Sequence, residues 1–513
     1  MQRRLLLLCA LVLFTCEGIK CSASETKDQK TVLFLAAYQK SPIIALQGLA
    51  EEMAQRNYRV LFAATNDDEH LISSTSNGVE FLSAGDPPKD APIALDIISL
   101  FIGENLYARE MYDALLPVLT ASPPDLIVFD PLSIAGEALA ERLNIPSVHV
   151  AAHLLDVAYL GVEPSPSYPM VITGYASSKM SLVERLINTV HIAAARFILP
   201  VVRGFIQNEF RNYAGLPSKW FEWSTPYGNS KLAIIANHFG TEYARPLPGN
   251  IQMTGPLLPR SHRPLSKQIE TWLAESDLPV VYISIGTNSI WTEASVNAVL
   301  EAIIEGSVKE GIYRVLWSIK SHQQSLMNPS RLEIAMKSLR VMIVPFVEQL
   351  AILEHNSTKV FVTHSGLSSV TESLFNGVPM LAMPMMLESD QPTIAARLEE
   401  LGVGIRIDRR QKEVTKQEFS SKLETILKDP NFYRQAERFQ TIYRTLNGRK
   451  RAADLLEVAM FDENFPKLLQ SLDASIFSNL DVYLVLLLLA IVIWKIINIL
   501  LSWCFRPRKM KQQ

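Results

Sequence analysis

Cysteine is absent from the long central part of the chain. The 513-residue sequence contains only Cys9, Cys16, Cys21 and Cys504, so residues 22–503 have none. This distribution excludes a disulfide framework and a cysteine-based zinc site in the central part. Stability must therefore come from buried apolar cores, which a chain with 48% hydrophobic residues can build.

A strong charge of either sign is also missing. The formal net charge is −3, from 49 basic and 52 acidic residues. This balance gives no reason to expect nucleic-acid binding, which relies on clustered positive charge. No cluster of histidine and carboxylate residues has the spacing of metal ligands, so we expect no metal site. The length predicts two or more globular domains.

The first residues have the pattern of a secretory signal peptide, expected over residues 1–23. Arg3 and Arg4 form a basic start, Leu5–Phe14 is apolar, and small residues suited to cleavage lie at Cys21–Ala23. The alternative is an uncleaved N-terminal anchor. The signal peptide would direct the chain into the secretory pathway.

An apolar stretch at the other end predicts a transmembrane helix over residues 481–505. Its central part, Leu484–Ile493, is purely aliphatic, and Lys495 interrupts the stretch. The tail at residues 506–513 is basic, so the positive-inside rule places it in the cytosol. Together with the signal peptide, this predicts a single-pass type I protein with its domains in the lumen.

Strand and helix patterns alternate in the N-terminal half, which we expect to form a domain over residues 24–245. The expected strands are Thr31–Ala36, Arg59–Ala64, Leu126–Phe129 and Ser147–Val150, and the expected helices are Ser41–Arg56 and Ile134–Leu143. This order is typical of βαβ units in a parallel sheet. Asp130 is therefore expected at the carboxyl end of a strand, where such sheets place functional groups.

A long apolar segment at Met180–Phe210 is expected to be helical. Leu182, Leu186 and Val190 recur on one face, and several arginines are scattered along it. Three interpretations stay open: a helix on a membrane surface, a cap over an apolar ligand pocket, or a buried helix of the domain.

A proline-rich stretch over residues 246–264 predicts a linker to a second α/β domain, expected over residues 265–455. Its strands are expected at Val280–Ile285, Arg314–Ile319 and Val341–Val344. The first strand is followed by Gly286 and Thr287; glycine permits close approach of a ligand, and threonine offers a hydroxyl. The alternative is a simple strand-ending turn. Closing helices are expected over residues 456–480.

The pattern at Lys359–Gln391 predicts a strand, a tight turn, a helix and a second strand. The turn is His364-Ser365-Gly366, and the helix is expected to end at about Phe375, before Asn376-Gly377. The second strand is expected at Met380–Met383.

Hydroxyl side chains crowd the start of this expected helix. Ser368 and Ser369 lie in its first turn, where free N–H groups and the helix dipole favour a phosphate. Glu372 lies about one turn further on, within reach of sugar hydroxyls beside that phosphate. The alternative is an ordinary crossover helix in a parallel sheet.

The stretch resembles the signature of the UDP-glycosyltransferase family, the UDP-glucuronosyl- and UDP-glucosyltransferases of glycosyltransferase family 1. The residues that carry the resemblance are His364, Gly366, Ser368, Ser369, Glu372, Asp390 and Gln391. The resemblance implies a GT-B fold, in which two Rossmann-like α/β domains face each other across a cleft. The N-terminal domain would bind an acceptor, and the C-terminal domain would bind a UDP-sugar through the residues just named.

The resemblance also implies donor contacts that precede the signature. Gly286 and Thr287 would lie near the diphosphate. Phe346 and Val347 stand where the family has a tryptophan that stacks on uracil, and Gln349 matches a glutamine that meets the ribose.

The resemblance implies a catalytic pair in the N-terminal domain as well. Family members carry a base histidine at the start of the first long helix and an aspartate that orients it. Here Asp130 matches the aspartate, whereas Pro42 stands where the histidine is expected. Three possibilities stay open: His153 supplies the base, Asp130 acts alone, or the chain binds a UDP-sugar without turning it over.

The resemblance implies a membrane-bound enzyme that transfers a hexosyl group, glucose or glucuronate, from a UDP-sugar to a small lipophilic acceptor. The UDP-sugar would be a co-substrate, with no cofactor. The tail resembles a dilysine retrieval signal, which implies the endoplasmic reticulum membrane, and a homo-oligomer is one possible assembly. Asn356-Ser357-Thr358 is a glycosylation sequon. The alternatives are a catalytically impaired binding or regulatory protein and a GT-B epimerase.

Overall fold

The computed structural model of the protein describes residues 29–462 and Lys495. Inside this range it leaves out residues 37–39, 74–77, 88–96, 131–132, 153–167, 170–172, 177–179, 219–231, 245–246, 248, 261, 287–288, 386–389 and 408–412. The expected signal peptide, nearly all of the expected transmembrane helix and the basic tail therefore lie outside the described residues.

The N-terminal half forms a seven-stranded parallel sheet in the order β3-β2-β1-β4-β5-β6-β7. Its strands are β1 (Thr31–Leu35), β2 (Arg59–Ala64), β3 (Val79–Ser83), β4 (Leu126–Phe129), β5 (Ser147–Ala151), β6 (Leu232–Ile235) and β7 (Ile251–Met253). The central strands are apolar throughout because helices cover both faces of the sheet. The strand order reverses between β1 and β4, so the switch point of this sheet lies there.

The C-terminal half forms a six-stranded parallel sheet in the order β10-β9-β8-β11-β12-β13. Its strands are β8 (Val280–Ser284), β9 (Arg314–Ser318), β10 (Val341–Val344), β11 (Thr358–Thr363), β12 (Met380–Ala382) and β13 (Gly404–Arg406). This is the order of a Rossmann-type sheet, and its switch point lies between β8 and β11.

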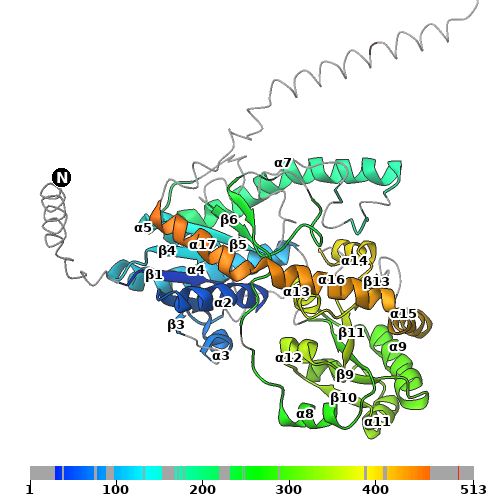
Figure 1. Ribbon diagram of the computed structural model, residues 1–513. Helices are drawn as coiled ribbons and strands as arrows, with labels where there is room; N and C mark the ends of the chain where they lie inside the picture. The colour runs from blue at the N-terminus through cyan, green and yellow to red at the C-terminus, as the bar shows by residue number, and fades with distance from the viewer. Residues whose placement is uncertain are drawn as a thin grey trace, which may run out of the picture.

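Helices pack on both sheets (Figure 1). Those of the N-terminal half are α2 (Lys40–Gln55), a 3₁₀ turn (Asn66–Asp68), α3 (Glu69–Ser73), α4 (Ile97–Ala121), α5 (Ile134–Leu143) and α7 (Leu182–Tyr213). Those of the C-terminal half are α8 (Lys267–Ala274), α9 (Glu293–Ile303), a π-helical turn (Ile304–Lys309), α10 (Ser321–Gln324), α11 (Pro329–Lys337), α12 (Gln349–Glu354), α13 (Leu367–Phe375), α14 (Gln391–Glu400), α15 (Lys416–Lys428), α16 (Pro430–Leu446) and α17 (Gly448–Phe461).

The expected linker and the last helix differ from the sequence interpretation. Residues 251–253, inside the stretch expected to be a linker, form the edge strand β7, which pairs with β6. A strand of three residues in a proline-rich stretch is too short to show the alternation of side chains by which strands are predicted from sequence. Residues 448–455, expected in the C-terminal domain, belong to α17, whose apolar face packs in the N-terminal core.

Helix α17 joins the N-terminal domain by burying small and aliphatic side chains against α2. Ala452, Ala453 and Leu456 are fully buried in the same core cluster as Leu46 and Leu49 of α2. Figure 1 shows α16 and α17 following each other across the molecule, from the C-terminal sheet to the N-terminal sheet. The end of the described chain therefore ties the two domains together.

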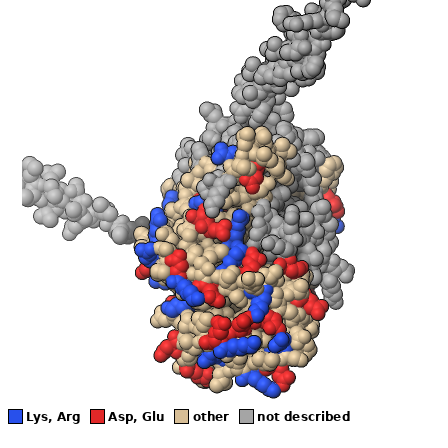
Figure 2. All heavy atoms as spheres, turned by 90° about the vertical axis from the view of Figure 1, so that its right-hand side faces the viewer, with Lys and Arg blue, Asp and Glu red and all other residues tan. Residues whose placement is uncertain are grey.

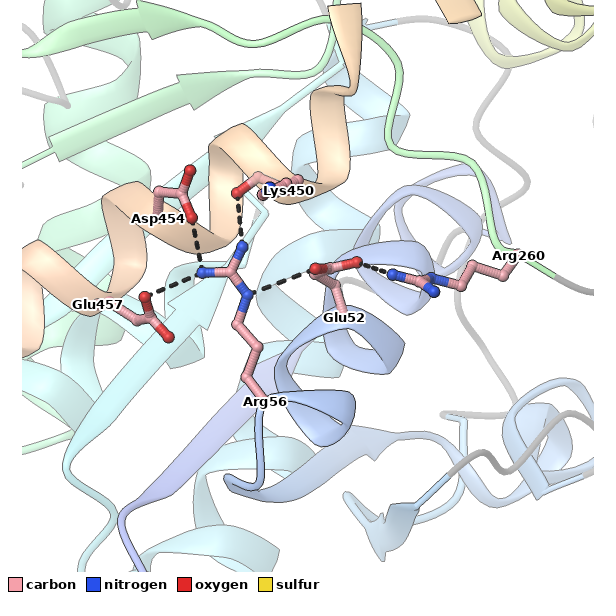
Figure 3. Close-up of polar contacts among 6 residues, drawn as sticks. All are labelled: Glu52, Arg56, Arg260, Lys450, Asp454 and Glu457. Carbon is pink, nitrogen blue, oxygen red and sulfur yellow. Dashed lines mark hydrogen bonds and ion pairs between the residues drawn. The ribbon is translucent and has the colours of Figure 1, made fainter.

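A charged network reinforces this contact (Figure 3). Arg56 of α2 pairs with Asp454 at 2.7 Å and Glu457 at 2.9 Å and donates to the backbone oxygen of Lys450 at 3.0 Å. On its other side Arg56 pairs with Glu52, which also binds Arg260 of the connecting segment. The network joins α2, α17 and the segment between the domains.

The described surface mixes charges of both signs. Figure 2 shows lysine, arginine and acidic side chains interspersed over the lower part of one face. Within the described residues, no helix has both the length and the apolar composition needed to cross a membrane.

Candidate functional site

The candidate donor site lies at the switch point of the C-terminal sheet. Strand β8 ends at Ser284 and is followed by Gly286, and β11 ends at Thr363 and is followed by His364. The two strands are adjacent and parallel, with Ser284 opposite Thr363 in the register. The sheet therefore brings Gly286 and His364 together, although 78 positions separate them in the sequence.

Two glycines leave the space that the imidazole of His364 occupies. A Cβ atom added to Gly286 would lie 2.6 Å from Cε1 of His364, and one added to Gly366 would overlap Nε2 of the same ring. Gly286 also has a φ of +79°, which favours glycine. Both positions are thus restricted to glycine by the histidine between them.

Burial keeps the imidazole of His364 neutral. Removal from water lowers its pKa to about 4, because the charged form loses its hydration. Its Nδ1 atom is buried and has no hydrogen-bond partner among the described residues. A neutral ring can donate one N–H hydrogen bond to a ligand oxygen at neutral pH.

The turn before α13 contains one residue, Ser365, with an uncommon backbone conformation. Ser365 has a φ of +68°, a left-handed conformation that is uncommon for residues other than glycine. Its side chain is fully buried, and its Oγ has no partner within the described part of the chain. Its backbone N–H donates to Oγ1 of Thr363 at 3.2 Å. The N-cap of α13 is Gly366, which has no side chain to cap the first N–H groups of the helix.

Glu372 is a buried carboxyl group held by Gln349. The amide nitrogen of Gln349 donates to Oε2 of Glu372 at 2.7 Å and to Oγ of Ser369 at 3.0 Å. Tyr282 of β8 donates to the amide oxygen of Gln349 at 3.4 Å. Burial raises the pKa of Glu372 to about 7, although the bond from Gln349 opposes this shift. The site therefore contains a carboxyl group that titrates near neutral pH.

Of the two site residues predicted just before Gln349, Phe346 has an exposed ring and Val347 has a buried side chain. Phe346 follows β10 and is 62% exposed, so its ring is free to stack on a planar ligand. Val347 is buried in the core cluster beneath the site. A phenylalanine that follows a strand usually lies in the core, but the ring of Phe346 lies at the surface.

The last signature residues begin α14. Asp390 is its N-cap position and is half-buried, and Gln391 is buried with its side-chain oxygen accepting the N–H of Met385 at 2.8 Å. Ser368 is half-buried in the first turn of α13. Thr287 lies outside the described residues.

The N-terminal domain contacts the start of α14. The N–H of Gly174 donates to Oγ1 of Thr393 at 3.1 Å, and Arg406 of β13 donates to the backbone oxygen of Gly174 at 2.9 Å. A segment of the first domain therefore lies beside the edge of the candidate donor site.

Asp130 lies at the switch point of the N-terminal sheet. It follows β4 directly, is 8% exposed, and donates its N–H to the carbonyl of Leu35 at the end of β1, at 3.4 Å. It is not the cap of α5, because Ser133 caps that helix by accepting the N–H of Gly136. Pro42 lies in the first turn of α2, and His153 lies outside the described residues.

One residue of the C-terminal site was missed by the sequence analysis. Tyr282 lies mid-strand in β8, and only the folded sheet brings its hydroxyl to Gln349. Ser365 was placed in the turn from the sequence, whereas its positive φ is a finding of the structure. Among the described residues, no group of three histidine, cysteine or acidic side chains could hold a metal ion.

The arrangement can hold a phosphorylated ligand with a flat base and a sugar. The uncapped start of α13 and His364 suit phosphate oxygens, and the ring of Phe346 suits a base. The carboxyl of Glu372 suits the hydroxyls of a ribose, because an ionised carboxylate accepts hydrogen bonds. A nucleotide combines a phosphate, a base and a sugar, so a nucleotide is the class of ligand that suits this site.

Comparison with known proteins gives a consistent set of relatives. The sequence model of the family described as "UDP-glucoronosyl and UDP-glucosyl transferase" matches residues 105–507. UDP-glucuronosyltransferase 2A3 from Cavia porcellus is 26% identical over 350 residues, which are 67% of this chain and 62% of that protein. UDP-glucuronosyltransferase 1A4 from Oryctolagus cuniculus is 24% identical over 80% of this chain and 70% of its own length. The match thus spans about three fifths of the first relative.

A solved structure supports the fold. A UDP-glucosyltransferase from Polygonum tinctorium, capable of glucosylating indoxyl and solved with 3,4-dichloroaniline, superposes with a TM-score of 0.60 at 16% identity. The superposition covers 85% of this chain and all of the plant protein. The two parallel-sheet domains therefore have the GT-B arrangement.

Proposed function

Because the chain belongs to the family of UDP-glucuronosyl and UDP-glucosyl transferases, we propose that it transfers a hexosyl group, glucose or glucuronate, from a UDP-sugar to a small lipophilic acceptor. The observation that carries this proposal is the site around His364, where β8 and β11 meet. Its geometry suits each part of a UDP-sugar donor. The UDP-sugar is a co-substrate here, and the proposal includes no resident cofactor.

The donor's diphosphate lies in this proposal at the start of α13. The N–H groups of the first turn and the helix dipole stabilise its negative charge, and the neutral ring of His364 adds one N–H hydrogen bond. Uracil stacks on Phe346, the ribose hydroxyls bind Glu372, and Asp390 and Gln391 face the transferred sugar. During transfer the same groups stabilise the negative charge that develops on the departing UDP.

The acceptor lies in this proposal at the switch point of the N-terminal sheet. Its oxygen attacks the anomeric carbon of the sugar, the bond from that carbon to the diphosphate breaks, and the acceptor's proton leaves to a base. Asp130 is the described carboxylate at that position, and the contact between Gly174 and Thr393 supports a short distance between the two domains there.

The membrane part of the proposal rests on the sequence. The expected signal peptide, the aliphatic stretch at residues 481–505 and the basic tail support a type I protein of the endoplasmic reticulum with lumenal domains. Asn356 is exposed at the turn before β11, which suits a glycosylation site.

The second candidate function is a UDP-sugar-binding or regulatory membrane protein. Pro42 favours it, because the family places the base histidine where this chain has a proline in the first turn of α2. Proline has no group that can accept a proton.

One experiment distinguishes the two functions. Microsomes that contain the full-length protein are incubated with radiolabelled UDP-glucose or UDP-glucuronate and pooled lipophilic acceptors. We expect labelled product from the wild type and at least a tenfold loss in Asp130→Ala. UDP binding with no transfer from either donor would contradict the enzyme and favour the binding protein. Gain of transfer in Pro42→His would then identify the missing base.

A further inference from the structure

A groove lies where the N-terminal half meets the edge strand β13 of the C-terminal sheet. Three segments line it: the turn at residues 238–240 that follows β6, the stretch from the end of α14 into β13 at residues 399–405, and one side of α16 at residues 431–442. We call it the junction groove. Its volume is about 870 Å³, which is the size of a cleft that holds a small molecule. Figure 1 shows α14, β13 and α16 close together beside this junction.

The junction groove is separate from the candidate donor site. Gly404, the first residue of β13, lines the groove, whereas the donor site lies beyond the last residues of β8 and β11. These strands are parallel, so their first and last residues lie at opposite ends of the sheet. Among the described residues that line the groove, none belongs to the candidate donor site. An inference about the groove therefore does not depend on the proposed glycosyl transfer.

Hydrogen bonds between the two domains hold the walls of the groove in place. Arg397 of α14 donates from Nε to the backbone oxygen of Gly240 at 2.9 Å. The Oγ1 atom of Thr241 lies 2.9 Å from the hydroxyl oxygen of Tyr443 in α16, within hydrogen-bond distance. The turn after β6 is thus fixed on both α14 and α16. A ligand that enters the groove does not have to order its walls, which favours binding.

Much of the lining is apolar, and it includes three phenylalanine rings. Phe439 is buried in one core cluster of the C-terminal domain, and Phe432 packs against another. Phe239 packs against a cluster of the N-terminal domain. Leu401 and Ile405 are partly buried and continue the apolar surface. Phenylalanine rings that are anchored in a core and line a groove offer a rigid surface to a planar apolar molecule.

The charged groups of the groove favour an anion. Its two acidic side chains, Glu399 and Glu400, each pair with an arginine at 3.1 Å. Arg438 is exposed on α16, and within the described part of the chain it contacts the neutral amide of Gln435 at 3.5 Å and no carboxylate. Burial lowers the pKa of His238, so its ring adds no positive charge at neutral pH. The guanidinium of Arg438 is therefore available to a ligand, and it suits a carboxylate.

We propose that the junction groove binds a small molecule that has a planar apolar body and one carboxylate group. The body packs against the phenylalanine rings, and the carboxylate accepts hydrogen bonds from the guanidinium of Arg438. Both domains line the groove, so its ligand binds the arrangement of domains that the structure shows. An uncharged molecule of the same shape lacks the pairing with Arg438 and binds more weakly.

The test locates the ligand by photocrosslinking to the purified full-length protein. The probe is 4-benzoylbenzoate, an aromatic carboxylate whose ketone attaches to nearby C–H bonds on irradiation, and 4-(hydroxymethyl)benzophenone is its uncharged counterpart. Saturating UDP-glucose is present in all samples, and mass spectrometry identifies the labelled peptides. The variant Arg438→Gln removes the cation. Arg434→Gln is the matched control, because Arg434 is exposed on the same helix and does not line the groove. Circular dichroism of each variant confirms that it is folded.

We expect the acid to label peptides from the three lining segments roughly threefold or more above the uncharged probe. Arg438→Gln should lower this labelling by a similar factor, and Arg434→Gln should leave it unchanged. Labelling by the acid at other peptides alone would overturn the inference. Equal labelling by the two probes, or equal labelling of Arg438→Gln and the wild type, would overturn it as well. Each of these outcomes is independent of whether the protein transfers a hexosyl group.

Discussion

Two glycines of the candidate donor site leave the space for one imidazole ring, that of His364. Gly286 and Gly366 approach His364 from two segments, and a Cβ atom at either position would collide with the ring. Gly366 itself has a φ of −64°, so its backbone is one that any residue can adopt. The ring alone therefore restricts this position to glycine.

We predict that Gly366→Ala weakens UDP binding at least tenfold, which corresponds to about 1.4 kcal/mol. The added methyl group would displace the imidazole, and with it the N–H donor of the diphosphate. Titration calorimetry with UDP measures the effect. Gly204→Ala in α7 is the matched control, because nothing lies within 4 Å of its added Cβ atom. An unchanged affinity in Gly366→Ala would contradict the role of His364.

Glu372 is a candidate site residue whose charge changes near neutral pH. Its folded pKa of about 7 lies above the ordinary glutamate value of 4.5 because the carboxyl is buried. The folded chain therefore holds this proton more tightly than the unfolded chain does. The contribution of Glu372 to stability is present below pH 4.5 and is lost as the pH rises to about 7.

The same titration predicts the pH dependence of donor binding. In the proposed function, ionised Glu372 accepts hydrogen bonds from the ribose hydroxyls. We therefore expect the affinity for UDP-glucose to rise up to about tenfold between roughly pH 6 and pH 8. UDP-glucose is the suitable ligand because its diphosphate diester does not titrate in this range. Affinities measured across this range should be flat in Glu372→Gln. An equal slope in that variant would assign the titration to another group.

At the scale of elements, α17 is the part of the chain that leaves its own domain. Its small side chains fit against α2, and Arg56 pairs with two of its carboxylates. The side chain of Arg56 is 18% exposed, whereas Asp454 is 58% exposed, so solvent screens part of this attraction.

We predict that Arg56→Ala lowers the stability of the domain contact by about 1–2 kcal/mol, because three carboxylates and a backbone oxygen lose their partner. The midpoint of thermal unfolding should fall by roughly 2–6 °C. Arg59→Ala is the matched control. Arg59 pairs only with Glu80 among the described residues, and both side chains are exposed; its loss should cost no more than about 0.5 kcal/mol. Equal shifts in the two variants would argue against a structural role for the network.

The elements that the sequence predicted well are continuous apolar strands. Arg59–Ala64, Leu126–Phe129 and Val341–Val344 have the same bounds in the structure, because buried parallel strands need apolar side chains on both faces. Helix α4 was missed; it contains Pro117, which interrupts a helical pattern. Strand β7 was missed because three residues carry no periodicity.

At the scale of the whole molecule, each of the two sheets places candidate functional residues at its switch point. Sequence patterns predicted both sheets and the residues after β11, since these residues are contiguous in the chain. They did not predict that Tyr282 and Gln349 support Glu372, or that Gly286 faces His364. Those contacts arise only when β8, β11 and α12 are brought together.

Hexosyl transfer by the purified full-length protein tests the central claim most directly. The measurement is the rate at which labelled hexose passes from UDP-glucose or UDP-glucuronate to a lipophilic acceptor, in the wild type, in His364→Ala and in the control Gly204→Ala. The account predicts transfer by the wild type and the control, and at least a tenfold lower rate in His364→Ala. Transfer by His364→Ala at the wild-type rate, or no transfer from either donor, would contradict it.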